Sequence, residues 1–297
     1  MDAPLVSVVI PTFARPRQLQ QSLEAFCIQT MPASQFELIV VDDGSPVPLD
    51  SIVDPYSKRL NVRLLRQSNA GPAAARNYGA NYSLAMLLAF TDDDCLPLPN
   101  WLESLVAANR DNPNALIGGS TKNGLPNDIF AETSQLILDL VYEHFNADPG
   151  NAYFLASNNI LCRRDRLLAL GGFDTGFPRA GAEDRDFCDR WRASGYPIVW
   201  HSDARVEHRH AQSFGRFIAL HYRYGRGAYI YHAKRRSRRS GNMAAELSFH
   251  AALIDRVSRR LKCSNRPLRS IQLLGALLIW QAANAAGFFM QAFLRNP

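Results

Sequence analysis

The chain has 297 residues, which is enough for one large domain or two small ones. A hydrophobic content of 47% and a charged content of 20% allow a large buried core and exclude a largely disordered chain. Five scattered cysteines without CxxC spacing argue against a disulfide framework and against a zinc site, and they are typical of a reducing compartment.

Charge is distributed unevenly along the chain. Residues 1–200 contain 16 Lys and Arg and 23 Asp and Glu, for a net charge of −7, whereas residues 201–297 contain 17 and 4, for a net charge of +13. An acidic first part followed by a basic second part suggests that the second part faces an anionic partner. A membrane surface, a phosphate-bearing substrate and nucleic acid are the candidates.

Short apolar runs alternate with helical segments through most of the chain. Most runs are rich in β-branched or aliphatic residues, which predicts buried strands. The predicted strands are residues 5–10, 36–41, 62–65, 84–90, 115–119, 156–162 and 197–200. Helical spacing and helix-start residues predict helices over residues 17–28, 71–79, 97–109, 129–145 and 183–191. This alternation predicts an α/β fold with a Rossmann-like, doubly wound, mostly parallel sheet.

Three adjacent acids, Asp92, Asp93 and Asp94, follow the apolar run at residues 84–90. Periodicity alone does not distinguish a strand from a helix for this run. If it is a strand, the acids enter the crevice where open α/β sheets bind ligands. Three adjacent carboxylates repel one another, and a hard divalent cation with oxygen ligands would stabilise them. The alternative is the acidic first turn of a helix.

Two other segments place polar groups at strand or helix ends. Asp42 and Asp43 end the run at residues 36–41 and precede a glycine, so both carboxylates lie in a turn after a strand. Gly71 precedes a predicted first helical turn, and Arg76 on that helix could reach a diphosphate. The alternative for this second segment is an Ala-rich helix with only a packing role.

A second acidic pair, Glu183 and Asp184, lies about ninety residues further along the chain. Gly181 before it indicates a loop that leads into a helix. A carboxylate there could act as a general base, or it could cap the helix and form ion pairs. His208 and His210 follow on an extended segment, where the i,i+2 spacing points both side chains the same way. Either histidine could ligate a metal.

Six short segments in this order resemble the family 2 glycosyltransferases, which have the GT-A fold. The segments are residues 6–13, 40–45, 69–79, 90–94, 171–174 and 183–184, and the resemblance covers about residues 5–230. It implies the transfer of a sugar from a nucleoside diphosphate, usually UDP, to a hydroxyl group with inversion. Thr91 departs from the family, which usually has Leu there, and residues 120–155, the expected acceptor region, contribute none of these segments.

The resemblance also implies roles for single residues. It assigns the catalytic base to Asp184, with Glu183 as the alternative. It assigns the Mn²⁺ or Mg²⁺ ion to Asp94, Asp92 and His208, with His210 as the alternative to His208. It assigns contacts with the nucleotide to Pro11, Thr12, Asp42, Asp43, Arg76, Asp92 and Asp93.

Two other functions could use the same motifs, namely a non-catalytic nucleotide-binding scaffold and a nucleotidyltransferase. Nucleotidyltransferases usually carry a Gly-rich phosphate loop with a basic residue near the N-terminus, and residues 12–15 lack that glycine pattern. Glu183 and Asp184 have a clear role only in glycosyl transfer. We therefore favour an inverting, metal-dependent glycosyltransferase.

A basic helical region over residues 221–297 is expected to follow a catalytic domain over residues 1–220. The cations at residues 234–239 form either a solvated face or a contact with anionic lipid. No nucleic-acid partner is expected, because stacking residues and a recognisable module are missing. Residues 270–294 carry no charge and would extend roughly 37 Å as a helix. They could span a bilayer, lie in its interface or pack on the catalytic domain.

The expected location follows from the two ends of the chain. The N-terminus has no basic stretch followed by an apolar run, so we expect no secretory signal. We expect a cytoplasmic enzyme at the inner face of the cell membrane, peripheral or anchored by residues 270–294. There it would use a nucleoside-diphosphate sugar and a saccharide or lipid-linked acceptor to build surface polysaccharide or glycolipid.

Overall fold

Eight strands form one mixed sheet in the computed structural model, which describes residues 3–177, 181–241, 243–262 and 267–295. The strand order is β3-β2-β1-β4-β7-β6-β8-β5. The strands are β1 (Val6–Thr12), β2 (Phe36–Asp42), β3 (Val62–Arg66), β4 (Leu87–Thr91), β5 (Cys95–Pro97), β6 (Leu116–Asn123), β7 (Asn159–Arg163) and β8 (Ile198–His208).

The first four strands in space give the sheet its Rossmann-like half. β3, β2, β1 and β4 are parallel neighbours, so their carboxyl ends meet at one edge. β7 then pairs antiparallel with both β4 and β6, and β8 runs parallel to β6. The predicted α/β fold with a mostly parallel sheet is confirmed, and the run at residues 84–90 ends in a strand.

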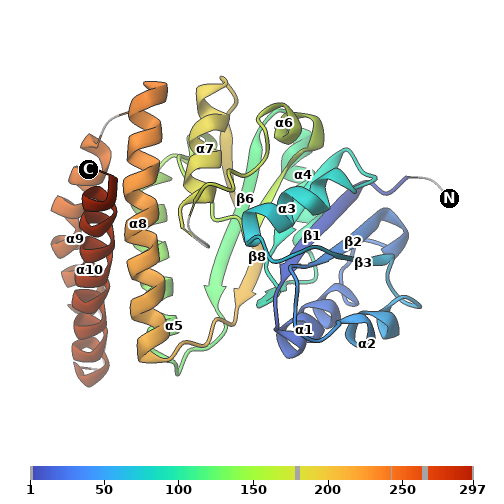
Figure 1. Cartoon of the computed structure of the whole chain (residues 1–297), viewed down its shortest axis with the longest axis horizontal. Helices are drawn as coiled ribbons and strands as arrows, with labels where there is room; N and C mark the ends of the chain where they lie inside the picture. Colours follow the sequence, from blue (N-terminus) through green and yellow to red (C-terminus); the bar gives the residue numbers. More distant parts are fainter. Residues whose placement is uncertain (1–2, 178–180, 242, 263–266, 296–297) are drawn as a thin grey trace.

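Helices cover both faces of this sheet and extend beyond one of its ends (Figure 1). They are α1 (Pro16–Phe26), α2 (Asp50–Val53), α3 (Pro72–Asn81), α4 (Trp101–Asp111), α5 (Ile129–Phe145), α6 (Arg164–Ala169), α7 (Glu183–Ala193), α8 (Phe214–Arg238), α9 (Ala244–Lys262) and α10 (Pro267–Arg295). Short 3₁₀ turns lie at Ala33–Gln35, Asp54–Tyr56 and Pro149–Asn151.

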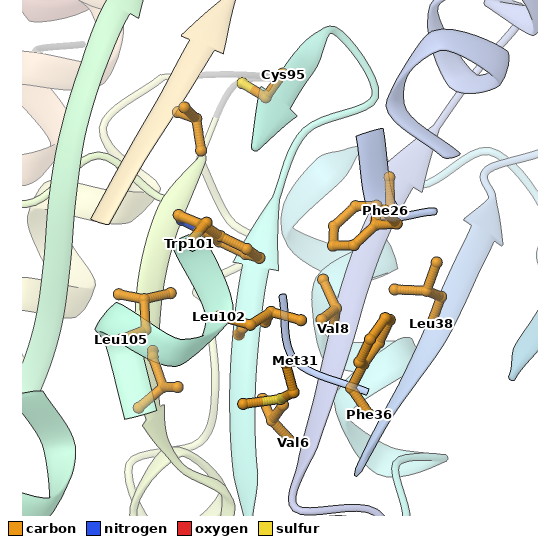
Figure 2. Packing of buried hydrophobic residues seen from close by; sticks show 14 of the residues in the cluster. Val6, Val8, Phe26, Met31, Phe36, Leu38, Cys95, Trp101, Leu102 and Leu105 are labelled. Carbon is orange, nitrogen blue, oxygen red and sulfur yellow. The ribbon is translucent and has the colours of Figure 1, made fainter. Parts of the chain in front are cut away.

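Alternating residues of β1 pack into two different cores. Val8 contributes to a cluster under α1 and α4, whereas Val9 contributes to a cluster on the opposite face with α3 and α7. Figure 2 shows the first cluster, in which Trp101 of α4 and Phe26 of α1 lie over the strands. Their ring centroids are 6.0 Å apart in an edge-to-face arrangement. Burial on both faces explains why the strands read as continuous apolar runs.

α8 stands between the sheet and the pair α9 and α10 (Figure 1). α8 and α10 approach backbone to backbone, because a Cβ on Gly225 would lie 1.9 Å from the Asn284 carbonyl oxygen. A Cβ on Gly287 would likewise lie 2.0 Å from the Tyr222 carbonyl oxygen. The boundary expected between residues 220 and 221 falls inside α8, which is one continuous helix. Residues 296 and 297 of the expected C-terminal region lie outside the described residues, as does Cys263.

One predicted helix boundary was wrong. The helix expected from residue 97 begins at Trp101, because Cys95–Pro97 forms the short strand β5. β5 pairs antiparallel with the end of β8, and this pairing sets Cys95 opposite His208. A three-residue strand carries no periodicity, so only this long-range partner defines it. β5 thereby brings His208 beside the acidic cluster.

Candidate active site

The three acids after β4 take three different roles. Asp94 is 5% exposed, and its Oδ1 lies 3.2 Å from Nε2 of His208 while its Oδ2 lies 2.9 Å from Nδ1 of His210. Asp93 is also buried and accepts a hydrogen bond from the Thr12 hydroxyl at 2.7 Å. The Asp92 side chain keeps 30% of its surface exposed and faces Arg76. The predicted metal residues Asp94 and His208 are therefore in contact.

His208 and His210 share the Asp94 carboxylate between them. Their rings stack with centroids 5.3 Å apart, as expected for the same side of an extended segment. Burial alone would raise the pKa of Asp94, but the two imidazoles hold this pKa well below its usual range. Burial alone would lower the pKa of His208, and Asp94 raises it instead. The contacts do not separate His208 from His210 as a metal ligand.

The donor atoms around Asp94 fit a hard divalent cation. One atom each of Asp94, Cys95 and His208 lie within 4.8 Å of one another. Burial raises the pKa of the Cys95 thiol well above its ordinary value, so this thiol stays protonated and is a poor ligand. A carboxylate oxygen and an imidazole nitrogen remain, and both are ligands that Mn²⁺ accepts, whereas Mg²⁺ prefers oxygen.

Arg76 joins the acidic cluster to the second acidic pair. This buried arginine donates from Nη2 to Asp92 at 2.7 Å and from Nη1 to Glu183 at 3.4 Å. Despite burial, which lowers it, the pKa of Arg76 is raised by Asp92 and Glu183. Its place on the first turns of α3, after Gly71 at φ 93°, brings the guanidinium close to both carboxylates. Residues that are about ninety positions apart in the chain are therefore neighbours.

Of the two acids at the start of α7, Asp184 has fewer hydrogen-bond and ion-pair partners than Glu183 among the described residues. Both oxygens of Glu183 have partners, since one faces Arg76 and the other accepts from the Gly181 N–H at 2.8 Å. In the described part of the chain, the Asp184 carboxylate accepts one hydrogen bond, from the Arg185 N–H to Oδ1. Burial and the neighbouring Glu183 charge raise the pKa of Asp184 to about 7. A carboxyl group with this pKa suits general base chemistry near neutral pH.

Four of the predicted nucleotide-binding residues, Pro11, Thr12, Asp42 and Asp43, lie at the carboxyl ends of β1 and β2. The Asp43 N–H donates to the Thr12 carbonyl oxygen, which follows Pro11. Asp43 accepts from the backbone N–H groups of residues 70 and 71, and so holds the loop that leads into α3. Asp42 accepts from the Ser45 N–H at 2.8 Å, and its second oxygen lies 3.4 Å from Nη1 of Arg66.

Arg15 is a site residue that the sequence interpretation missed. It donates from Nη1 to Asp93 at 3.0 Å and to Asp94 at 2.9 Å. Burial and the charge of Asp94 raise the pKa of Asp93 to about 7, even though Arg15 lowers it. Arg15 lies 78 and 79 residues before these two acids in the chain, so no local spacing in the sequence indicates the contact.

Much of the basic run at residues 234–239 faces the protein itself, which corrects the expectation of a free basic surface. Lys234 pairs with Asp174 at 2.5 Å. Arg235 and Arg238 pair with Asp189, and Arg238 also pairs with the fully buried Asp186. The acidic part of the chain therefore neutralises these cations of the basic part, and Arg235 and Arg238 attach α8 to α7.

The fold and the site together define a glycosyltransferase of the GT-A type. A polar sheet edge, an acidic cluster suited to a divalent cation and a separate carboxylate are combined in one site. Residues 7–170 match the family described as glycosyl transferase family 2. The chain belongs to this family and is an enzyme of glycan or glycolipid synthesis.

Named relatives and a solved structure agree with this family. Glycosyltransferase AglE of Haloferax volcanii is 30% identical over 227 residues, which span 75% of this chain and 73% of AglE. Glucosyl-dolichyl phosphate glucuronosyltransferase of the same organism is 27% identical over 219 residues, which span 69% of each chain. The mannosyltransferase PcManGT of Pyrobaculum calidifontis, solved with GDP-Man and Mn²⁺, shares the fold with a TM-score of 0.69 at 18% identity, over 100% of this chain and 88% of PcManGT.

Proposed function

We propose that the chain is an inverting, metal-dependent glycosyltransferase that moves a sugar from a nucleoside-diphosphate donor, with UDP as the expected nucleotide, to a hydroxyl group. The observation that supports this most is the position of Arg76, which contacts both Asp92 and Glu183. It places the acids expected at the donor diphosphate beside the acids expected at the acceptor. Neither a scaffold nor a nucleotidyltransferase needs that second carboxylate pair.

The donor side of the site would hold a divalent cation. Asp94 and His208 would bind it, with Asp92 as the further carboxylate and His210 as the alternative imidazole. When bound, the cation supplies a Lewis acid for the negative charge that develops on the leaving diphosphate. Arg15 is close to Asp94 and adds a second positive charge on this side of the site. The Mn²⁺ in the related mannosyltransferase structure supports this assignment.

Asp184 would act on the acceptor side. Its carboxylate takes the proton from the acceptor hydroxyl, and the hydroxyl oxygen forms a bond to the anomeric carbon of the donor. The bond from that carbon to the diphosphate breaks on the opposite face, so the configuration is inverted. Glu183 stays ion-paired with Arg76. Burial and the charge of Glu183 hold the pKa of Asp184 high, so that Asp184 is a strong enough base near neutral pH.

We also propose that α10 attaches the enzyme to the cytoplasmic face of the membrane. Pro267–Leu294 is one helix of 28 residues, long and apolar enough to cross a bilayer by length and composition, with 33% of its most apolar window buried. One face packs on α8, while Ile271 (67% exposed), Leu278 (64%) and Phe293 (77%) are open to the surroundings. A helix packed on one side and apolar on the other favours peripheral association over spanning.

Two measurements test the proposed function. Isothermal titration with UDP, GDP, dTDP and CDP, with and without Mn²⁺, should reveal one nucleotide that binds only with the metal. Asp184→Asn should keep this binding and lower sugar transfer by about 10²–10⁴-fold, which is the usual contribution of a general base. Wild-type protein that is folded but binds none of the four would refute the donor assignment. Full transfer by the Asp184→Asn variant would refute the choice of base.

A further inference from the structure

One face of α8 lies along the catalytic domain and contacts the loop that precedes Asp184, the proposed base. Positions 216, 220, 223, 227, 231, 234 and 238 recur every three or four residues and so share one side of the helix. At the middle of this face, a Cβ on Gly227 would lie 2.1 Å from the carbonyl oxygen of Gly181. Gly181 precedes Glu183 and Asp184 by two and three residues. This face of α8 therefore passes directly beside the start of α7.

The cations on this face differ in their ion-pair partners on the two sides of Gly227. Toward the C-terminal end of α8, Lys234 and Arg238 are paired with Asp174, Asp186 and Asp189. Toward the N-terminal end, Arg216 and Arg223 are exposed, and neither has a carboxylate within ion-pair distance in the described part of the chain. Acidic residues thus neutralise the C-terminal half of this face, and the N-terminal half keeps its positive charge.

Tyr224 marks where this positive half meets the catalytic acids. It lies one helical turn before Gly227, is 40% exposed, and its ring meets the buried His221 ring edge to face with centroids 5.6 Å apart. Burial, and then the charges of Asp184, Glu183 and Asp92, raise the pKa of this phenol. Arg223 lies one helical turn before Gly227, on the face of α8 that contacts Gly181, and so on the side of the site that holds the proposed base.

We propose that Arg223, supported by Arg216 two turns earlier, binds a phosphate group carried by the acceptor. This inference rests on the proposed function, because it assigns the acceptor side by the position of Asp184. An exposed, unpaired guanidinium beside a reacting hydroxyl is suited to a phosphate, which it can bind through two parallel hydrogen bonds. Tyr224 follows Arg223 in the chain, its phenol feels the charge of Asp184, and it would position the alcohol next to the base. The phosphate could be part of a lipid carrier or of a saccharide.

Binding of simple phosphate probes to the full-length protein tests this directly. Geranylgeranyl phosphate and glycerol 3-phosphate represent the lipid and the soluble source, and geranylgeraniol and glycerol are their uncharged counterparts. Wild type should bind at least one phosphate probe about ten-fold more tightly than its counterpart, and Arg223→Gln should remove this preference. Arg223→Lys should restore it in part, because the charge remains without the two-pronged geometry.

Arg236→Gln is the matched control. Arg236 is exposed on the same helix, but nine residues from Gly227 and so on the opposite face, and its loss should leave probe binding unchanged. Equal binding of the phosphate probes by wild type and Arg223→Gln would overturn the proposal. So would a loss of nucleotide binding in Arg223→Gln, which would assign the guanidinium to the donor. Wild type that binds phosphate probes but no nucleotide would refute the proposed function and leave this site standing.

Discussion

Gly227 of α8 lies against Gly181 so closely that a Cβ on Gly227 would come within 2.1 Å of the Gly181 carbonyl oxygen. Backbone atoms cannot move aside as the end of a flexible side chain can. The loop that leads to Glu183 and Asp184 is thus positioned by a helix that lies outside the sheet.

Gly227→Ala should therefore displace this loop or α8. We expect a fall in kcat on the order of 100-fold, because small misplacements of a catalytic group are costly, with nucleotide affinity nearly unchanged. Steady-state kinetics together with nucleotide titration would separate the two effects. Gly275→Ala is the control, since a Cβ at Gly275 of α10 meets no atom within 4 Å. Wild-type kcat in Gly227→Ala would contradict the positioning role of α8.

Activity should depend on pH through Asp184. Its pKa is raised to about 7, so the carboxyl is protonated and inactive as a base below that pH. The value of kcat/KM should rise about ten-fold per pH unit below pH 7 and level off above it. The measurement is a pH profile at saturating metal, with nucleotide affinity recorded at each pH to separate donor binding from base ionisation. A profile that is flat from pH 5.5 to 8 would exclude Asp184 as the base.

His221 should make the fold sensitive to acid. It is 2% exposed, neither ring nitrogen has a hydrogen-bond partner among the described residues, and burial lowers its pKa to about 4. The unfolded chain takes up this proton near pH 6.5, so the stability contributed by the neutral ring is present above pH 6.5 and is lost as the pH falls toward 4. At pH 5 the loss from this group is about 2 kcal/mol.

His221→Phe tests this expectation. The variant should unfold in urea with an unchanged or higher free energy of unfolding at pH 7.5, because an apolar ring replaces an unpartnered polar one. The loss between pH 7.5 and pH 5 should be smaller than in wild type. The same pH dependence in both proteins would show that His221 is not the titrating group.

Membrane attachment should depend on the exposed face of α10. Replacing Ile271 and Leu278 by Gln removes two side chains that are 67% and 64% exposed. We expect binding to anionic lipid vesicles to weaken by about ten-fold or more, because each buried aliphatic side chain contributes roughly 1.5–3 kcal/mol. Ile28→Gln, at an equally exposed isoleucine next to α1, is the control in the same sedimentation assay. Unchanged vesicle binding would show that the exposed face of α10 does not bind the lipid.

The strands and the main site residues could be predicted because their signals are local. β2 and α5 begin at the predicted residues, and the carboxyl ends of β1, β2 and β4 carry the expected polar groups. Strand periodicity and turn chemistry are encoded within a few residues, so a single sequence contains them.

The remaining features depend on contacts between distant residues. β5 exists because it pairs with β8, and α6 was missed because six residues carry little periodicity. The ion pair of Lys234 with Asp174 joins residues 60 positions apart, and no spacing in the sequence indicates it. The same holds for the contact of Arg15 with the acidic cluster. Predicting these features would have required the fold in advance.

The contacts of Gly225 with Asn284 and of Gly287 with Tyr222 join α8 to α10 without intervening side chains. Since α8 also contacts the catalytic loop through Gly227, direct backbone contacts connect α10 to the loop that precedes Asp184. If α10 rests on a bilayer as proposed, the base is held at one height above the lipid surface. The enzyme would then select acceptors by reach, accepting those whose hydroxyl group stands at that height and excluding shorter or longer carriers.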